Sequence, residues 1–404
     1  MKLVSAAVAV ALAGVAIPAA AQQAAPAAPA PAESQPKPSS KAQAAIIALQ
    51  TAVNANDTAN IPAKVAAAQA VASTPADRYW IARLQLNAAV KANNLAAEQQ
   101  AVDAIAATNA LSGPTIGELY VGLGNELLKA KQYDQAVALY QKASALAPNN
   151  PDYVLAIAQA RSEQGQKAEA ATAVQRAIAL SRAAGQKPSE DLYKNAASLA
   201  YEAKSPSAVS NARDWLAAYP SDDSWRNSLA IYRNLNRADP DTVIDVMRLS
   251  SLTNSMQTLG DYASYADKAL DEGNYGEAKA VIDAGVAAGK LKANDPSVAQ
   301  VLASARGKVP TAAQLAAAEK TAVIPTAFLK VGDRYYAAGD YAKAAALYRQ
   351  ALAKGVDPSL ANLRLGEALT RSGDKAGATA AFNAVSGPRS ELAKFWLVYL
   401  QTHA

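Results

Sequence analysis

A pattern of aromatic, apolar and small residues recurs every 34 residues, and it constrains the fold more than any other feature of the sequence. It is clearest in two tandem pairs, residues 117–150 with 151–184 and residues 325–358 with 359–392. A repeat of this length is typical of a helix-turn-helix unit that buries its apolar face only by stacking on its neighbours. In the first unit the recurring residues are Tyr120, Leu123, Gly124, Leu127, Tyr133, Ala136, Tyr140, Ala143, Leu146 and Pro148.

Two sets of glycines agree with this arrangement. The first set falls where the first helix of a unit should end and a positive φ is useful: Gly165, Gly339 and Gly373. The second set lies inside first helices, where glycine costs about 1 kcal/mol relative to alanine: Gly124, Gly332 and Gly366. We therefore expect a close approach of a neighbouring helix at each glycine of the second set.

These units resemble the tetratricopeptide repeat, whose pattern is an aromatic residue, Leu-Gly and Tyr, followed by Ala, an aromatic, Ala and Pro. The resemblance implies an all-α, right-handed α-solenoid of about ten helix-turn-helix units. The first helices should line a concave groove, and the second helices should form the outer surface. The alanine-rich composition, with 51% hydrophobic residues and only three Phe, favours such closely packed helices.

The remaining segments match the repeat less closely. We expect degenerate N-terminal units at residues 41–116, irregular helix pairs at 185–258 and one further unit at 259–292. Residues 293–324 read as an irregular helical connector that either bends the solenoid or divides it into two arms, and the sequence leaves both open. A helix within 393–404 should cap the apolar face of the last repeat.

The N-terminal residues have the pattern of an export signal. Lys2 precedes a run of about 15 apolar residues, and an Ala-x-Ala site predicts cleavage before Gln22, so residues 1–21 read as a signal peptide. The run is shorter than the ~20 residues that span a bilayer. Residues 22–40, rich in Ala and Pro, should form a disordered linker. Because the chain has no cysteine, it should be neither disulfide-bonded nor a lipoprotein. We expect a soluble periplasmic or secreted product.

Few residues are available for catalysis or for metal binding. With no cysteine and only His403, the sequence lacks the residues of zinc sites, cysteine nucleophiles and Ser-His triads, and no phosphate-binding glycine loop is present. The net charge of +5 is dispersed, which argues against nucleic-acid binding. The paired acids are best explained as helix caps: Asp222 with Asp223, Asp239 with Asp241, and Asp271 with Glu272. We predict a protein that is not an enzyme and needs no cofactor or metal.

The candidate binding residues are the non-core positions of first helices. In the N-terminal tandem they form an apolar strip with amide groups, suited to an extended peptide: Val121, Asn125, Leu128, Leu155 and Gln159. In the C-terminal tandem they are Leu329, Lys330, Asp333, Tyr336, Leu363, Arg364, Glu367 and Arg371. Lys330 and Arg364 stand one repeat apart and should form a basic column for an acidic group or a C-terminal carboxylate.

Two functions remain open at this point. The resemblance implies a non-catalytic exported scaffold that binds protein segments of cell-envelope machinery in its groove. The alternative is a protein that binds or processes envelope glycan, with Tyr336 as the aromatic residue best placed to contact a sugar. Some members of the family clamp the C-terminal tail of a chaperone with Lys and Asn. Asn125 matches that Asn, but Val121 replaces the Lys, so tail binding is not expected.

Overall fold

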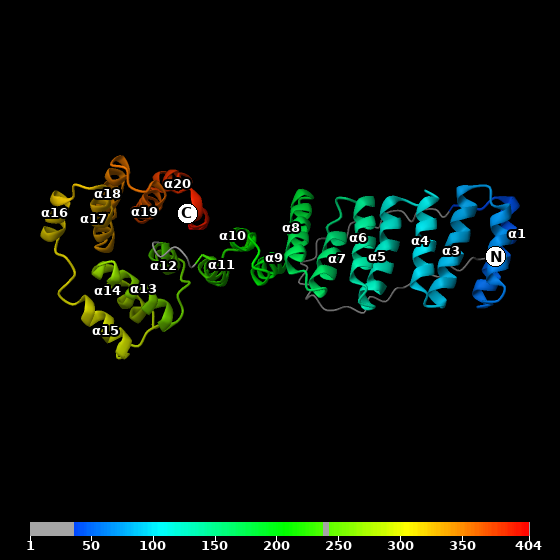
Figure 1. The fold of residues 1–404 in the computed structure, drawn as a ribbon, viewed down its shortest axis with the longest axis horizontal. Coiled ribbons are helices and arrows are strands. Elements are labelled where there is room, and N and C mark those ends of the chain that lie inside the picture. The colour runs from blue at the N-terminus through cyan, green and yellow to red at the C-terminus, as the bar shows by residue number, and fades with distance from the viewer. Residues whose placement is uncertain (1–35, 237–241, 404) are drawn as a thin grey trace. The chain divides into compact units, whose positions relative to one another are not determined.

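The computed structural model describes residues 36–236 and 242–403. The predicted signal peptide, most of the predicted linker, and the paired acids Asp239 and Asp241 lie outside these residues. Within them the chain forms 21 α-helices and no strand, which confirms the prediction of an all-α solenoid of helix-turn-helix units. The chain divides into two compact units, Met1–Leu199 (unit 1) and Ala200–Ala404 (unit 2) (Figure 1). The division falls within α9 (Glu190–Glu202) and not at residues 293–324.

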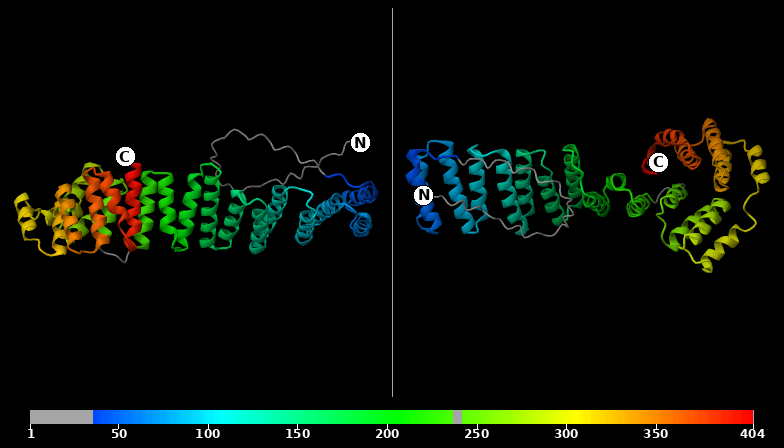
Figure 2. Two further views of the ribbon diagram at one scale, coloured as in Figure 1. Left: turned by 90° about the horizontal axis from the view of Figure 1, so that it is seen from above. Right: turned by 180° about the vertical axis from the view of Figure 1, so that it is seen from behind.

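Unit 1 is a row of antiparallel helix pairs in which each pair packs against the next (Figures 1 and 2). The first helix of one pair also contacts the first helix of the following pair, as α5 contacts α7. The helices are α1 (Ser40–Asn54), α2 (Ile61–Val71), α3 (Pro75–Lys91), α4 (Leu95–Ala107), α5 (Gly113–Lys129), α6 (Tyr133–Leu146), α7 (Pro151–Glu163) and α8 (Lys167–Ala183).

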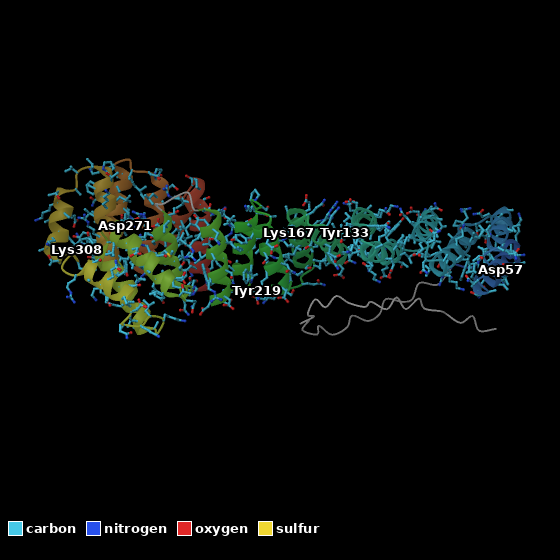
Figure 3. The ribbon with its side chains drawn as sticks, turned by 60° about the horizontal axis from the view of Figure 1, so that its bottom comes forward. Asp57, Tyr133, Lys167, Tyr219, Asp271 and Lys308 are labelled. Carbon is cyan, nitrogen blue, oxygen red and sulfur yellow. The ribbon has the colours of Figure 1, made fainter. Side chains whose placement is uncertain are left out.

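Local sequence sets the helix ends in unit 1. The side chain of Asn150 accepts a hydrogen bond from the backbone N–H of Asp152, and Pro151 occupies the first turn, so α7 begins there. Gly165 has φ = 85°, which confirms the expected left-handed residue between α7 and α8. Tyr133 and Lys167 open the second helices α6 and α8 (Figure 3).

The interior glycines make room for aromatic rings of the second helix. A Cβ atom on Gly124 would lie 2.5 Å from Cε1 of Tyr140, and the corresponding distances are 2.7 Å for Gly332 against Tyr348 and 2.4 Å for Gly366 against Phe382. The predicted close approach is therefore confirmed, and it occurs between the two helices of one unit. Only a residue without a side chain fits at these positions.

Two glycines of α5 offer a matched test of this packing. We expect Gly124→Ala to lower the free energy of unfolding by about 1–3 kcal/mol, because Tyr140 is fully buried and hydrogen-bonded and its ring cannot retreat. Gly122 has open space around its Cα, so Gly122→Ala should raise the free energy by about 0.5–1 kcal/mol through helix propensity. Urea unfolding followed by circular dichroism measures both changes. Effects of the same sign would contradict this account.

The residues just before α1 are attached to the start of α3. The backbone N–H and the hydroxyl of Ser39 donate to Asp77, at 2.7 and 2.9 Å, and the indole N–H of Trp80 donates to the carbonyl of Pro36 at 2.7 Å. Burial alone would raise the pKa of Asp77, but backbone N–H donors, with that of Ser73 foremost, hold it well below its usual range. This end of the predicted linker is therefore bonded to unit 1.

Unit 2 contains the other helices. They are α10 (Ala208–Ala218), α11 (Asp222–Leu235), α12 (Val243–Leu252), α13 (Leu259–Asp271), α14 (Tyr275–Ala287), α15 (Pro296–Ala305), α16 (Ala312–Thr321), α17 (Pro325–Ala337), α18 (Tyr341–Ala353), α19 (Pro358–Arg371), α20 (Lys375–Asn383) and α21 (Ser390–Thr402), with a short 3-10 turn at Gly387–Arg389. In the predicted connector, α15 packs against α13 and α14, while α16 packs against α17.

The last helix of unit 2 does more than cover the final repeat. α21 packs against α20, as a cap would, and also against α10, the first helix that lies wholly in unit 2 (Figure 2). The ring of Trp396 stacks on Phe382 at 5.5 Å between centroids, and Tyr232 of α11 meets Phe395 edge-on at 6.0 Å. Arg213 of α10 pairs with Glu391 of α21. The end of unit 2 thus packs against its beginning.

Candidate functional site

The predicted binding residues of unit 1 lie on α5 and α7, two first helices in contact. Val121, Asn125 and Leu155 are half-buried, Gln159 is exposed, and Leu128 is 9% exposed. The amide oxygen of Asn125 accepts a hydrogen bond from the Tyr140 hydroxyl at 2.8 Å. Burial raises the pKa of Tyr140, so that hydroxyl keeps its proton and remains the donor.

The side-chain amides of Asn125 on α5 and Gln159 on α7 leave different groups available for hydrogen bonding. Asn125 uses its oxygen internally, and its amide nitrogen has no partner among the described residues, so two N–H donors are available. Gln159 instead donates from its amide nitrogen to Glu163 at 3.0 Å and leaves its oxygen as an acceptor. A donor and an acceptor on adjacent first helices match the alternating groups of an extended peptide backbone.

The predicted binding residues of unit 2 are mostly buried. Only Lys330 and Arg371 are exposed, and the guanidinium of Arg371 lies 4.7 Å from the centroid of the Tyr341 ring. The buried members are Leu329, Asp333, Tyr336, Leu363, Arg364 and Glu367. The expected basic column is therefore wrong, because Lys330 faces solvent while Arg364 is 5% exposed and paired with acids.

These residues are buried partly because α12 of the same chain lies against them. Its Val246 and Leu249 belong to one hydrophobic cluster with Leu329, Tyr336 and Leu363. Its Asp245 contacts Arg364, and its Arg248 contacts Glu367 and the ring of Tyr336.

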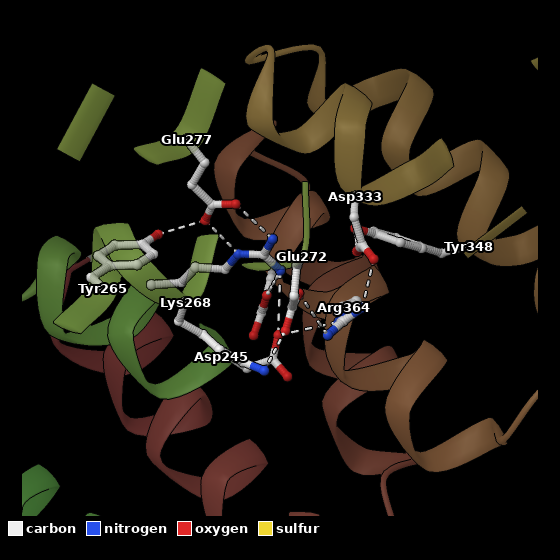
Figure 4. A network of polar contacts seen from close by, with 10 residues as sticks. Asp245, Tyr265, Lys268, Glu272, Glu277, Asp333, Tyr348 and Arg364 are labelled. Carbon is white, nitrogen blue, oxygen red and sulfur yellow. Dashed lines mark hydrogen bonds and ion pairs between the residues drawn. The ribbon is translucent and has the colours of Figure 1, made fainter. Parts of the chain in front are cut away.

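A buried polar network in unit 2 includes Asp245, Glu277 and Arg364 (Figure 4). Arg248 is at its centre. Its guanidinium donates to both carboxylate oxygens of Glu277, at 2.8 and 2.9 Å, and to Glu367 Oε2 at 3.0 Å. The ring centroid of Tyr336 lies 4.1 Å from its central carbon, a cation–π contact. Burial is the largest single influence and acts to lower the pKa of Arg248, but the carboxylates of Glu277 and Glu367 together raise it well above its usual range, so the side chain is charged.

Arg364 forms the second half of the network (Figure 4). It donates to Asp333 Oδ2 at 2.6 Å and to Asp245 Oδ1 at 3.3 Å, and lies 3.8 Å from Glu272. The other oxygen of Asp333 accepts the hydroxyl of Tyr348 at 2.7 Å. The residues come from six helices of unit 2, so the network joins segments that are distant in sequence.

Asp245, Arg248 and Glu277 are not among the residues predicted from the sequence. A signal was present, because VIDVMRLSSL in α12 carries apolar residues on all sides, which is typical of a buried helix. An Asp and an Arg three residues apart in such a helix must find partners inside the protein. The sequence does not say which acids and bases those partners are.

The network offers structural stabilisation, because its acids are buried against arginines. Tyr336, the proposed sugar-contacting residue, is also buried and is covered by Arg248. Of the other paired acids, Asp222 and Asp223 lie in the first turn of α11. Within residues 36–236 and 242–403, no three acidic, His or Cys side chains are placed to hold a metal ion. None of the described helices is both long and apolar enough to cross a bilayer.

Comparisons with known proteins agree with the repeat pattern. Two family models described as tetratricopeptide repeat match residues 127–184 and 329–391. No curated protein matches the chain.

Solved structures are similar only at low identity. A tetratricopeptide repeat protein from Parabacteroides merdae is 13% identical, covering 72% of this chain and 99% of that one, with a TM-score of 0.27. The TPR2AB domain of yeast Sti1, in a complex with pHSP90, is 14% identical, covering 72% and 95%, with a TM-score of 0.26. Pseudomonas aeruginosa pilF is 14% identical, covering 56% and 96%, with a TM-score of 0.25. These scores are too low to carry an argument about function. The family models thus identify tetratricopeptide repeats in both units of the chain, at residues 127–184 and 329–391.

Proposed function

We propose that this protein is a non-catalytic, exported scaffold of the cell envelope that binds an extended segment of a partner protein on the α5–α7 face of unit 1. Tetratricopeptide repeats serve protein–protein interaction, and the matched repeat at 127–184 includes part of this face. The signal-peptide pattern supports export, and the envelope role rests on that pattern and on the family resemblance.

One observation carries the choice of this face. The predicted binding residues of unit 2 are mostly buried and paired within the chain, whereas those of α5 and α7, except Leu128, are half-buried or exposed. Val121 and Leu155 present half-buried apolar surface, and Asn125 and Gln159 present an amide donor and an amide acceptor. Apolar contacts with a few placed hydrogen bonds are what holds an extended peptide.

A pull-down from envelope extract with charge-altered variants tests this proposal. Leu155→Lys places a charge in the centre of the face without touching the Tyr140–Asn125 hydrogen bond, and we expect it to weaken capture of the partner at least about tenfold. Lys330→Glu on α17 is the matched control, an exposed residue of unit 2, and should leave capture unchanged. Circular dichroism checks that both variants are folded.

Two results would overturn the proposal. If Lys330→Glu released the partner and Leu155→Lys did not, binding would belong to unit 2. If the chain retained peptidoglycan fragments and no protein, a glycan-binding role would replace the scaffold.

A further inference from the structure

The buried network of unit 2 contains more acids than bases. Its two arginines, Arg248 and Arg364, face four buried carboxyl groups: Asp245, Glu277, Asp333 and Glu367. At the rim, where Glu272 lies 3.8 Å from Arg364, Lys268 pairs with Glu272 at 3.0 Å, so those charges cancel locally. If all four buried carboxyl groups were ionised, the network would hold an uncompensated negative charge out of contact with water, which is strongly unfavourable.

Hydrogen bonding separates the four acids into two kinds. Both oxygens of Glu277 accept from Arg248, and Tyr265 adds a third donor at 2.6 Å. Both oxygens of Asp333 also have donors, Arg364 and Tyr348. Oxygens supplied with donors in this way favour the ionised form.

Asp245 and Glu367 do not have hydrogen-bond donors on both oxygens. Each has one buried oxygen, Oδ2 and Oε1 respectively, with no hydrogen-bond partner among the described residues, although both side chains are fully buried. Their other oxygens lie on the same nitrogen, Arg248 Nη1, at 3.3 and 3.0 Å. The two carboxyl groups therefore both accept from the same NH₂ nitrogen and are close neighbours.

We propose that Asp245 and Glu367 share one proton in the folded protein and form a proton-binding site between α12 and α19. A carboxyl O–H on one of them donates to the unpartnered oxygen of the other, which satisfies both atoms with one hydrogen bond. The same proton removes one of the excess negative charges. Two carboxylates that share a site cannot both ionise readily, as in other carboxyl pairs.

The directions in which the pKa values of the buried groups are shifted agree with a shared proton. Burial raises the pKa of Glu367 well above its usual range, and the charge of Asp245 adds to the effect; burial also raises the pKa of Asp245 against the pull of Arg364 and Arg248. The phenols of Tyr265, Tyr336 and Tyr348 have raised pKa values through burial and stay neutral, so they supply no competing charge.

The proton makes the stability of unit 2 depend on pH with a defined sign. The folded state keeps a proton that the unfolded chain releases above its ordinary carboxyl pKa of about 4. The stabilisation is thus fully present below about pH 4 and is lost as the pH rises through the raised pKa. Asp261 has the opposite effect on stability, but only at more acid pH. Burial acts to raise its pKa, yet hydrogen bonds, foremost the one from the backbone N–H of Gln257, lower it.

Amide substitutions test the shared proton by mimicking the protonated acid. Asp245→Asn and Glu367→Gln each place an N–H donor where the O–H would be. At about pH 8 each single variant should keep or increase the folding equilibrium constant of unit 2. The increase should be about tenfold for each unit by which folding raises the pKa of the replaced acid. The double variant should lose this gain, because two amide N–H₂ groups would then face each other. Glu277→Gln is the matched control and should lower the constant, because both oxygens of Glu277 accept hydrogen bonds from Arg248 and an amide can accept only one of them.

The measurement uses the full chain with Trp80→Phe, which leaves Trp215, Trp225 and Trp396 as fluorescent reporters, all in unit 2. Urea unfolding at about pH 5 and about pH 8 should show a loss of stability with rising pH in the wild-type sequence and a smaller loss in the single amide variants. Infrared spectroscopy of the native protein at neutral pH should show a protonated carboxyl band that disappears in Asp245→Asn and in Glu367→Gln. Destabilisation by both single variants equal to that of Glu277→Gln, or the absence of the infrared band, would overturn the proposal.

Discussion

Replacing Arg248 by methionine should lower the free energy of unfolding of unit 2 by about 3–5 kcal/mol. Methionine retains much of the length of the side chain, so the main loss is the charge and its hydrogen bonds. Glu277, Glu367 and Asp245 would then be buried without their common donor. Leaving a buried charge uncompensated costs far more than an exposed ion pair contributes. Urea unfolding read by the fluorescence of unit 2 measures the change.

Two further variants make the Arg248 result specific. Lys279→Met removes an ion pair with Asp283 in which both side chains are about half exposed, and it should cost less than about 1 kcal/mol. Arg248→Lys keeps the charge but cannot bond both oxygens of Glu277 in a planar fork, so its loss should fall between the other two. A loss for Arg248→Met no larger than that for Lys279→Met would show that the network does not stabilise unit 2.

Replacing Trp396 by alanine should cost unit 2 about 3–5 kcal/mol, the usual effect of removing a fully buried large aromatic side chain. The indole stacks on Phe382 of α20 and meets Tyr399 of its own helix edge-on, at 5.9 Å between centroids. Its removal leaves a cavity where α21 joins the last repeat to the start of unit 2. Circular dichroism during urea unfolding should show unit 2 unfolding at lower denaturant, with the transition of unit 1 unchanged.

Gln401→Ala is the control on the same helix, because Gln401 is exposed and its truncation should change the free energy by no more than about 0.5 kcal/mol. Trp396→Phe should lose less than Trp396→Ala, since it keeps a ring against Phe382 and removes an indole N–H that has no partner among the described residues. If Trp396→Ala shifted the unfolding transitions of both units equally, the contribution of α21 to stability would not be confined to unit 2.

Properties that depend on residues close together in the chain can be predicted from the sequence. Gly165 was expected to end a first helix and has φ = 85°. Gly124 was expected at a close approach, and the ring of Tyr140 lies against it. Both follow from the 34-residue period, because the two helices of a unit pack through side chains at constant spacing.

The candidate residues of unit 2 could not be placed in this way. Arg364 and Glu367 occupy the groove positions of a repeat, and the period indicates only which side of the helix they are on. Whether that side meets solvent or protein depends on α12, which comes from a part of the chain with no clear repeat pattern. Asp245 and Glu367 are 122 residues apart by their numbers, and nothing local links them.

The sequence by itself determined the all-α fold, the pairing of helices within each clear repeat and the positions of the glycines, because helix periodicity and turn chemistry act over a few tens of residues. The tertiary structure alone decided that the chain divides within α9, that α21 packs back on α10, and that α12 covers the predicted groove residues of unit 2. It also decided which acids meet which arginines. Burial and charge pairing between distant segments depend on how whole helices pack, and no short stretch of sequence specifies that.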